Sequence, residues 1–222
     1  MAKVECPMMA FGTNALKTLT RSEEKQLQII NAAKKVFLEK GFDIASMDMI
    51  AAEAGVSKRT VYSHYQSKEN LFASIMNDLC ASKRGEIIDE TEMDACDLLP
   101  KDKSVEETLT IFGNIFLTYI YDPEVLAMLR IMIGQADKFP EIGESFYNQG
   151  PVMTQNMLTA YFEHTNGTGE TKFQDTCIAA KSFISSLLGP NHLKCMFGAK
   201  PPSEKEIKEH VDQVVSLFTS CC

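Results

Sequence analysis

The chain has 222 residues, of which 45% are hydrophobic and 23% are charged, and its net charge is −8. These proportions are typical of a folded globular protein and argue against extensive disorder. No stretch approaches the roughly 20 consecutive apolar residues of a membrane span. Residues 1–20 also lack the basic-then-apolar order of a signal peptide, so we expect a cytoplasmic protein without a membrane partner.

The negative charge is concentrated in the C-terminal part of the chain. Residues 1–70 contain ten Lys and Arg against eight Asp and Glu, a net charge of +2. Residues 71–222 contain twelve against twenty-two, a net charge of −10. The first part is therefore compatible with nucleic-acid binding, although the protein as a whole is acidic.

Seven cysteines are scattered along the chain without a Cys-x-x-Cys pair or an accompanying histidine cluster. This spacing predicts no metal site and no cofactor. Most of the thiols are expected to be buried. Cys221 and Cys222 could form disulfides between subunits, or they could belong to a frayed terminus.

Apolar residues recur at helical spacing after a polar N-terminal arm at 1–19. The first predicted helix begins at a capping box of Thr20 and Glu23 and ends at Gly41, and Ser67 is placed to cap a later one. Further helix starts are marked by capping boxes or by a cap followed by proline: Ser104–Glu107, Asp122-Pro123 and Ser203–Glu206.

The rest of the chain also reads as helices joined by loops. A long helix over roughly 140–164 is expected to break or kink at Gly150-Pro151. Residues 88–103 and 189–202 are predicted to be loops. Since no run of residues alternates between apolar and polar as a half-buried strand would, the sequence predicts an all-α protein of about nine helices.

Residues 46–65 carry the densest local pattern. Ser46 can cap a short helix, Gly55 can adopt the left-handed conformation that ends it, Val56 can fill the corner, and Ser57 can cap a second helix. Apolar and small residues mark the inner face of the first helix: Met47, Ile50, Ala51 and Ala54. This order of features predicts a helix-turn-helix.

The second helix of this motif separates into two faces. Val61 and Tyr65 can point to the core, whereas cations, hydroxyls and an imidazole point outward: Lys58, Arg59, Thr60, Ser63 and His64. Such a helix end suits the major groove, and its positive dipole favours phosphates. The alternative is a solvated helical hairpin, which the combined cap, glycine corner and polar face disfavour.

The run from Gln28 to Phe72 resembles the N-terminal domain of TetR-family regulators. The matching pieces are Ile29-Ile30-Asn31-Ala32-Ala33, Phe37, Gly41-Phe42, Ser46-Met47, Ile50-Ala51, Ala54-Gly55-Val56-Ser57-Lys58, Thr60-Val61-Tyr62, His64-Tyr65 and Ser67-Lys68-Glu69-Asn70-Leu71-Phe72. The resemblance implies a dimer, usually a repressor, that releases double-stranded operator DNA when a small molecule enters its C-terminal domain.

The resemblance also implies roles for single residues. Ser46, the Met47 amide, Thr60, Tyr62, His64 and Lys68 match phosphate-contacting positions, and Lys58 matches a position used for phosphates or bases. Arg59 departs from the family, which often has a small residue there; it could read a guanine or contact a phosphate. The predicted DNA-binding set is Ser46, Met47, Ser57, Lys58, Arg59, Thr60, Tyr62, Ser63, His64 and Lys68.

Residues 104–162 are rich in aromatic and methionine side chains, which form either an ordinary core or an adaptable apolar cavity. Asn114, Gln135 and Asn156 are polar residues of this segment that could orient a ligand. Asp122–Arg130, Ala136–Glu141 and Phe146-Tyr147 are similar to the AefR-like subgroup, whose members often control multidrug efflux genes. The predicted ligand-binding set is Phe112, Phe116, Tyr119, Met128, Met132, Gln135, Phe146, Met153, Met157 and Phe183.

We therefore expect an arm at 1–19, a helix-turn-helix domain at 20–66, and an effector-binding and dimerisation domain at 67–222. The two terminal helices could pair with those of a second subunit or pack within one subunit. The leading hypothesis is a dimeric repressor released by a small apolar or amphipathic ligand; the alternative is a DNA-binding or architectural protein without an effector. No catalytic motif is present, so we do not expect an enzyme.

Overall fold

The computed structural model describes residues 20–87, 99–100 and 102–220. The predicted arm at 1–19, most of the predicted loop at 88–103 and the pair Cys221–Cys222 lie outside the described residues. The described residues are helical without strands, as the sequence predicted, and the helices are α1 (Arg21–Lys40), α2 (Met47–Glu53), α3 (Lys58–His64), α4 (Lys68–Ile87), α5 (Val105–Ile120), α6 (Pro123–Gln135), α7 (Pro140–Tyr147), α8 (Met153–Thr168), α9 (Thr176–Met196) and α10 (Glu204–Ser220).

The predicted helix starts are confirmed by their hydrogen bonds. Thr20 accepts from the backbone N–H of Glu23 at 3.3 Å, and the Glu23 carboxylate accepts from the Thr20 N–H at 2.7 Å. The equivalent reciprocal bonds join Ser104 to Glu107, and Asp122 caps α6 ahead of a first-turn proline. Each cap satisfies backbone donors that the first turn of a helix leaves free.

The long helix predicted at roughly 140–164 extends to Thr168 and does not break at Gly150-Pro151, but its geometry changes locally there. α7 passes through a single π-helical turn, Asn148–Val152, directly into α8, so these segments form one helix and the described chain has nine. Pro151 lies inside this turn. A proline cannot donate to the preceding turn of an α-helix, and local widening of the helix accommodates it.

The predicted loop at 189–202 is wrong for its first half. α9 continues to Met196, with one non-helical residue, Gly189 (φ 50°, ψ −166°), followed by Pro190. Proline is well suited to begin a new helical segment, so the pair kinks the helix without ending it. Residues 197–203 alone form the connection to α10.

Carbonyl groups before this kink bond to side chains from other helices. The Tyr121 hydroxyl at the end of α5 donates to the Leu188 carbonyl at 3.5 Å. Nε2 of His210 in α10 lies 3.0 Å from the Leu187 carbonyl and 3.2 Å from the Ser186 carbonyl. Polar groups from two neighbouring helices thus replace hydrogen bonds that the kinked backbone cannot make.

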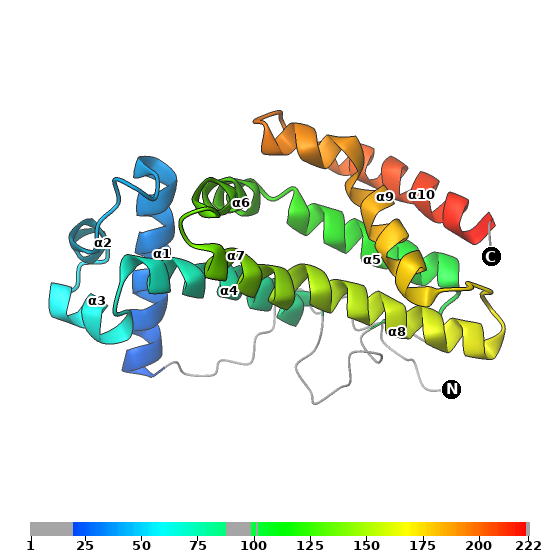
Figure 1. The fold of residues 1–222 in the computed structure, drawn as a ribbon, viewed down its shortest axis with the longest axis horizontal. Coiled ribbons are helices and arrows are strands. Elements are labelled where there is room, and N and C mark those ends of the chain that lie inside the picture. The colour runs from blue at the N-terminus through cyan, green and yellow to red at the C-terminus, as the bar shows by residue number, and fades with distance from the viewer. Residues whose placement is uncertain (1–19, 88–98, 101, 221–222) are drawn as a thin grey trace, which may run out of the picture.

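The buried apolar side chains form two cores. The first joins α1–α4 to one face of α6 and to α7, and it contains the ring cluster of Phe37, Phe42 and Phe72, whose centroids lie 5.1–5.5 Å apart. The second lies among α5, α8, α9 and α10 and also includes Leu126 of α6. Figure 1 shows α1–α3 at one end of the molecule and α8–α10 at the other, with α6 and α7 between them.

Candidate DNA-binding site and ligand-binding region

The α2–α3 corner is built from local bonds that place α3 on the outside of the molecule. The Ser46 hydroxyl accepts from the Met49 N–H at 3.3 Å, and the Ser57 hydroxyl accepts from the Thr60 N–H at 3.1 Å. Gly55 has φ 62°, which favours glycine because a side chain would be strained there. The turn and both caps are therefore as the sequence predicted.

Packing against the first core holds these two short helices in place. Helices of seven residues do not persist alone in water, so their stability depends on tertiary contacts. The Gln28 amide in α1 donates to the Ala54 carbonyl at 2.7 Å, which ties α1 to the end of α2. The buried side chains of the motif are Met47, Ile50, Ala51, Ala54, Val61 and Tyr65.

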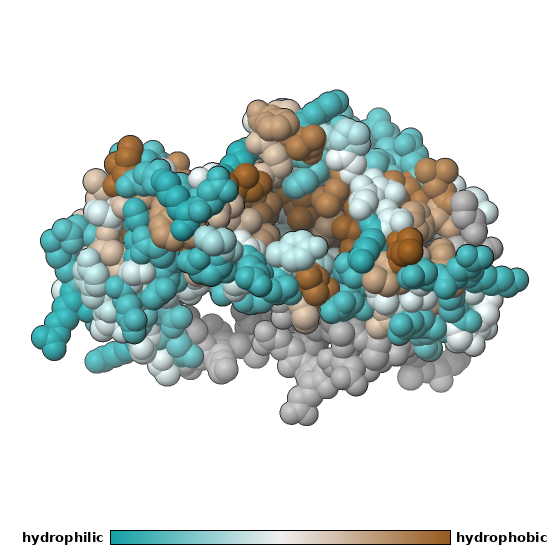
Figure 2. Space-filling view, viewed as in Figure 1, coloured by the Kyte–Doolittle hydropathy of each residue, from teal (hydrophilic) through white to brown (hydrophobic). Residues whose placement is uncertain are grey.

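The outward face of α3 carries polar side chains. Lys58, Arg59, Tyr62 and Ser63 are exposed, whereas Thr60 and His64 are half-buried. Figure 2 shows that hydrophilic residues cover much of the end of the molecule formed by α2 and α3. Arg59 makes no hydrogen bond or ion pair with any described residue, so its guanidinium group is available to a partner.

Several members of the predicted DNA-binding set already have partners within the chain. The Met47 side chain is buried, which leaves only its backbone amide available for DNA. The Ser57 and Thr60 hydroxyls lie 2.8 Å apart, and the Lys58 ammonium pairs with the Asp48 carboxylate. These residues lie together at one end of the molecule, and their contacts with DNA remain predictions.

Lys68 lies apart from the others at the start of α4. Its ammonium donates to the Phe42 carbonyl at 2.7 Å and to the Ala45 carbonyl at 3.0 Å, and it lies 4.4 Å from the centre of the Phe42 ring. Two of its three N–H groups therefore tie α4 to the α1–α2 connection. One N–H remains for the predicted phosphate contact.

Helix α6 connects the helix-turn-helix to the rest of the chain. Lys34 of α1 forms an ion pair with Glu124 at 3.0 Å, and Lys138 after α6 pairs with Asp43 at 2.9 Å. The bond from Lys138 lowers the pKa of Asp43. A displacement of α6 would therefore act directly on α1 and on the α1–α2 connection through these two ion pairs.

Arg130 joins the other side of α6 to the end of α9. Its guanidinium donates to the Cys195 carbonyl at 2.6 Å and to the Met196 carbonyl at 3.2 Å. These are carbonyls of the last helical turn, where the negative end of the helix dipole attracts a cation, and the Cys195 carbonyl also accepts from the Gly198 N–H at 2.9 Å. Sequence reasoning missed this role because the two partners are 65 and 66 residues away from Arg130.

The predicted ligand-binding residues divide between the two cores. Tyr119, Met128, Met132 and Phe146 belong to or pack against the first core, and Phe112, Phe116, Met157 and Phe183 belong to or pack against the second. Met128 and Phe183 are wholly buried, whereas Met153 is 41% exposed. The structure therefore brings these residues together as two groups on either side of a seam.

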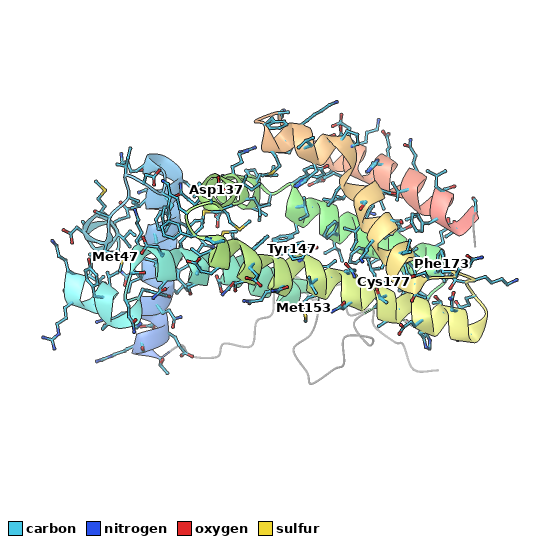
Figure 3. The ribbon with its side chains drawn as sticks, viewed as in Figure 1. Met47, Asp137, Tyr147, Met153, Phe173 and Cys177 are labelled. Atoms are coloured by element: carbon cyan, nitrogen blue, oxygen red, sulfur yellow. The ribbon has the colours of Figure 1, made fainter. Side chains whose placement is uncertain are left out.

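A hollow with hydrophobic residues at its base lies between α6, α9 and α8 (Figure 2). Tyr147, which is 58% exposed, points toward this space from the end of α7 (Figure 3). Met196 packs against both cores and so marks the seam. Partly buried apolar side chains that pack against one of the two cores from α5, α6, α7 and α9 are Phe116, Tyr119, Met132, Phe146, Ile184 and Leu188.

The three polar residues that the sequence suggested as ligand contacts, Asn114, Gln135 and Asn156, differ in their surroundings. Asn114 bonds to the Thr110 carbonyl of its own helix at 2.8 Å, and Asn156 is exposed. The buried Oε1 atom of Gln135 and the buried Nδ1 atom of His192 have no hydrogen-bond partner among the described residues. Burial lowers the pKa of His192, which favours the neutral imidazole.

Two open clefts are also present. One, of about 310 Å³, lies between the α1–α2 connection and α6 and is lined by Phe42, Arg130 and Gln135 among others. The other, of about 270 Å³, is lined by Val105, Glu106, Glu170, Thr171 and Thr219. Gln135 is the one member of the predicted ligand-binding set in either lining. No group of three metal-ligating side chains occurs in the described part of the chain.

A capped, exposed second helix behind a glycine corner, supported by a separate helical body, defines a helix-turn-helix DNA-binding regulator. Residues 29–75 match the model of bacterial regulatory proteins of the tetR family, and residues 107–221 match the C-terminal domain of AefR-like transcriptional repressors. The chain belongs to the TetR family of transcriptional regulators. Across residues 20–87, 99–100 and 102–220, no helix is long and apolar enough to cross a membrane.

Individual relatives resemble this chain over different lengths. A TetR-family regulator from Mesorhizobium loti has 29% identity and a TM-score of 0.80, with 91% of this chain and 98% of that one covered. The flavonoid-responsive regulator FrrA has 30% identity and a TM-score of 0.72, with 90% and 97% covered. The transcriptional activator FasR of Mycolicibacterium smegmatis is 41% identical over 54 residues, which is 24% of this chain and 25% of FasR.

Proposed function

We propose that this regulator is a dimeric repressor that leaves its operator when a small apolar or amphipathic molecule binds in the seam between the two cores. The observation that carries the proposal is the position of α6. This helix contributes to the first core, is joined to α1 by the Lys34–Glu124 ion pair and borders the hollow, and Arg130 ties it to α9. A ligand in the seam would therefore act on the same helix that supports the DNA-binding end.

The DNA contacts are proposed to centre on the first turns of α2 and α3. Ser46 and the Met47 amide would bind phosphate at the N-terminus of α2, where backbone N–H groups are free. Arg59 is exposed and unpaired within the described chain, which suits a bidentate contact with guanine in the major groove. Thr60, Tyr62 and His64 would bind the flanking phosphates.

Dimerisation is proposed to involve α9 and α10. These helices expose large apolar side chains that do not contribute to either core, and Phe197 between them is 84% exposed. A single helix-turn-helix reads one half-site, and a two-fold pair reads two successive major grooves. The other exposed apolar side chains on these helices are Ile178, Leu193 and Leu217.

The ligand class is proposed from the side chains that border the hollow. Partly buried aromatic and methionine side chains of the two cores suit an apolar body, and the unpartnered Nδ1 atom of His192 on α9 suits a hydroxyl or amide group on that ligand. FrrA is flavonoid-responsive, and a flavonoid is a planar aromatic molecule with several hydroxyl groups. Efflux genes are proposed as targets from the likeness to AefR-like repressors.

A ligand can release DNA only to the extent that it prefers the conformation that does not bind DNA. We therefore expect hydroxylated aromatic compounds to dissociate the protein from an operator duplex that it has selected from a random pool. Fluorescence anisotropy of the labelled duplex measures this release. If no compound changes either DNA affinity or thermal stability, the alternative of a regulator without an effector is favoured.

The DNA-binding surface is tested by Arg59→Ala. Loss of a bidentate base contact should weaken operator binding by about 1–3 kcal/mol, and binding to a scrambled duplex should weaken less. The melting temperature should not change, because the side chain has no partner in the described chain. An equal loss on both duplexes would show a phosphate contact in place of base reading.

A further inference from the structure

An ion pair between Asp48 and Lys58 joins the first turn of α2 to the first turn of α3. Both side chains are largely exposed, at 55% for Asp48 and 65% for Lys58. An ion pair with this exposure adds little to stability, because solvent screens it. Its position is therefore more informative than its strength: it lies at the N-termini of both helices proposed to face DNA.

The pair changes the charge that this surface presents to DNA. Lys58 and Arg59 are the two basic residues at the start of α3, and Asp48 neutralises the first of them. The Asp48 carboxylate also lies in the helical turn whose free N–H groups, with Ser46, are proposed to bind phosphate. A fixed negative charge at this place opposes any DNA backbone that approaches without a compensating contact.

We propose that Asp48 is a specificity-determining residue that weakens binding to non-cognate DNA. It does so by holding Lys58 away from phosphates and by repelling the backbone near α2. At a cognate site the cost is offset, because the carboxylate accepts a hydrogen bond from a cytosine amino group in the major groove. Discrimination between DNA sequences then arises from weaker binding to non-cognate sequences as well as from favourable contacts with the cognate one. This inference rests on the proposed DNA-binding surface.

Asp48→Asn tests the proposal because it removes the charge while keeping the shape. Glu53→Gln is the matched control: it removes one negative charge from the other end of α2, where Glu53 pairs with Lys35 at 2.6 Å in a similarly exposed ion pair. The probes are the duplex that the wild-type chain selects from a random pool and a scrambled duplex of equal composition. Circular dichroism and melting temperature verify that each variant is folded.

For Asp48→Asn we expect about tenfold tighter binding to the scrambled duplex and a salt dependence steeper by about one, as one more lysine reaches a phosphate. Affinity for the operator should rise less, so that the ratio of operator affinity to scrambled-duplex affinity decreases. The variant should also lose the preference for cytosine at one position of each half-site. Adding Lys58→Met to Asp48→Asn should cancel the gain on scrambled DNA. Glu53→Gln should leave the ratio unchanged.

An unchanged ratio for Asp48→Asn, or an equal change for Glu53→Gln, would overturn the role of Asp48 while leaving DNA binding by the wild-type chain intact. Failure of the wild-type chain to select any sequence would instead contradict the proposed function, and the role of Asp48 with it. The two failures are therefore distinguished by the wild-type selection alone.

Discussion

The helix-turn-helix end and the helical body of this protein are shaped by bonds of different range. In the α2–α3 corner, Ser46 and Ser57 bond to residues three positions away, and Gly55 makes the turn between them. In the body, Tyr121 bonds to a residue 67 positions away, and Arg130 to one 65 positions away. The helix-turn-helix end is thus specified locally, whereas the helical body depends on the assembled fold.

This difference suits the two proposed tasks. A surface that reads DNA must hold its side chains in one geometry, and short-range caps on a packed core provide it. A body that responds to a ligand needs elements with alternative arrangements, and the kink at Gly189 offers α9 such a place. Other helices of the body are closely packed. A Cβ atom on Gly113 would lie 2.8 Å from Cγ1 of Val211, so α5 and α10 are in direct contact there.

The largest expected effect is a loss of stability, and it distinguishes core residues of the helical body from residues that contact the ligand. Phe183 is wholly buried, so Phe183→Ala should lower the free energy of unfolding by about 3–5 kcal/mol through the cavity that it leaves. Phe116 is only partly buried, and Phe116→Ala should cost less stability while weakening ligand binding more. Denaturant unfolding and compound titration measure the two quantities. The opposite ranking would mean that Phe183 bounds a ligand cavity.

A smaller effect is expected where the two regions are joined. Arg130→Met keeps the length of the side chain and removes its bonds to the Cys195 and Met196 carbonyls. Stability should fall by about 1–3 kcal/mol, since a charged donor is lost from partly buried acceptors. Operator affinity without ligand should be retained, and ligand should release less DNA. Normal release by this variant would place the coupling elsewhere.

The smallest effect concerns the pH dependence of the body. Burial lowers the pKa of His192 below its value of 6.5 in the unfolded chain. Well above pH 6.5 the imidazole is neutral in both states. As the pH falls through 6.5 the unfolded state binds the proton first, so stability falls as the pH falls toward the lowered pKa of the folded state. His192→Gln should remove this component.

Because the ring is only partly buried, the difference should be about half a kcal/mol or less. Chemical denaturation of both proteins at pH 7 and at about pH 5 checks it. The carboxylates of Asp43, Glu107 and Glu206, whose pKa values are lowered by hydrogen bonds, affect both proteins alike. A steeper pH dependence in the variant would contradict the assigned direction.

In the C-terminal part, sequence patterns predict the helices but not which apolar side chains are buried in a core. Apolar spacing identified its helices, but the same spacing is produced by a core and by a cavity wall. Met128 is wholly buried, and Met153, with similar chemistry, is 41% exposed. The loop predicted at 189–202 failed for a related reason: Gly189-Pro190 is a strong local signal to end a helix, and His210 and Tyr121 from distant helices stabilise the kink instead.

The sequence by itself determined the fold class, the helix-turn-helix and the family. Their determinants, caps three residues apart, a left-handed glycine and a two-faced helix, act within one or two turns of chain. Only the tertiary structure decided that Asp48 meets Lys58 across the corner, that Lys68 is bonded to carbonyls of the α1–α2 connection, and that α6 links both cores. Those contacts join residues that packing brings together, so no local pattern in the sequence predicts them.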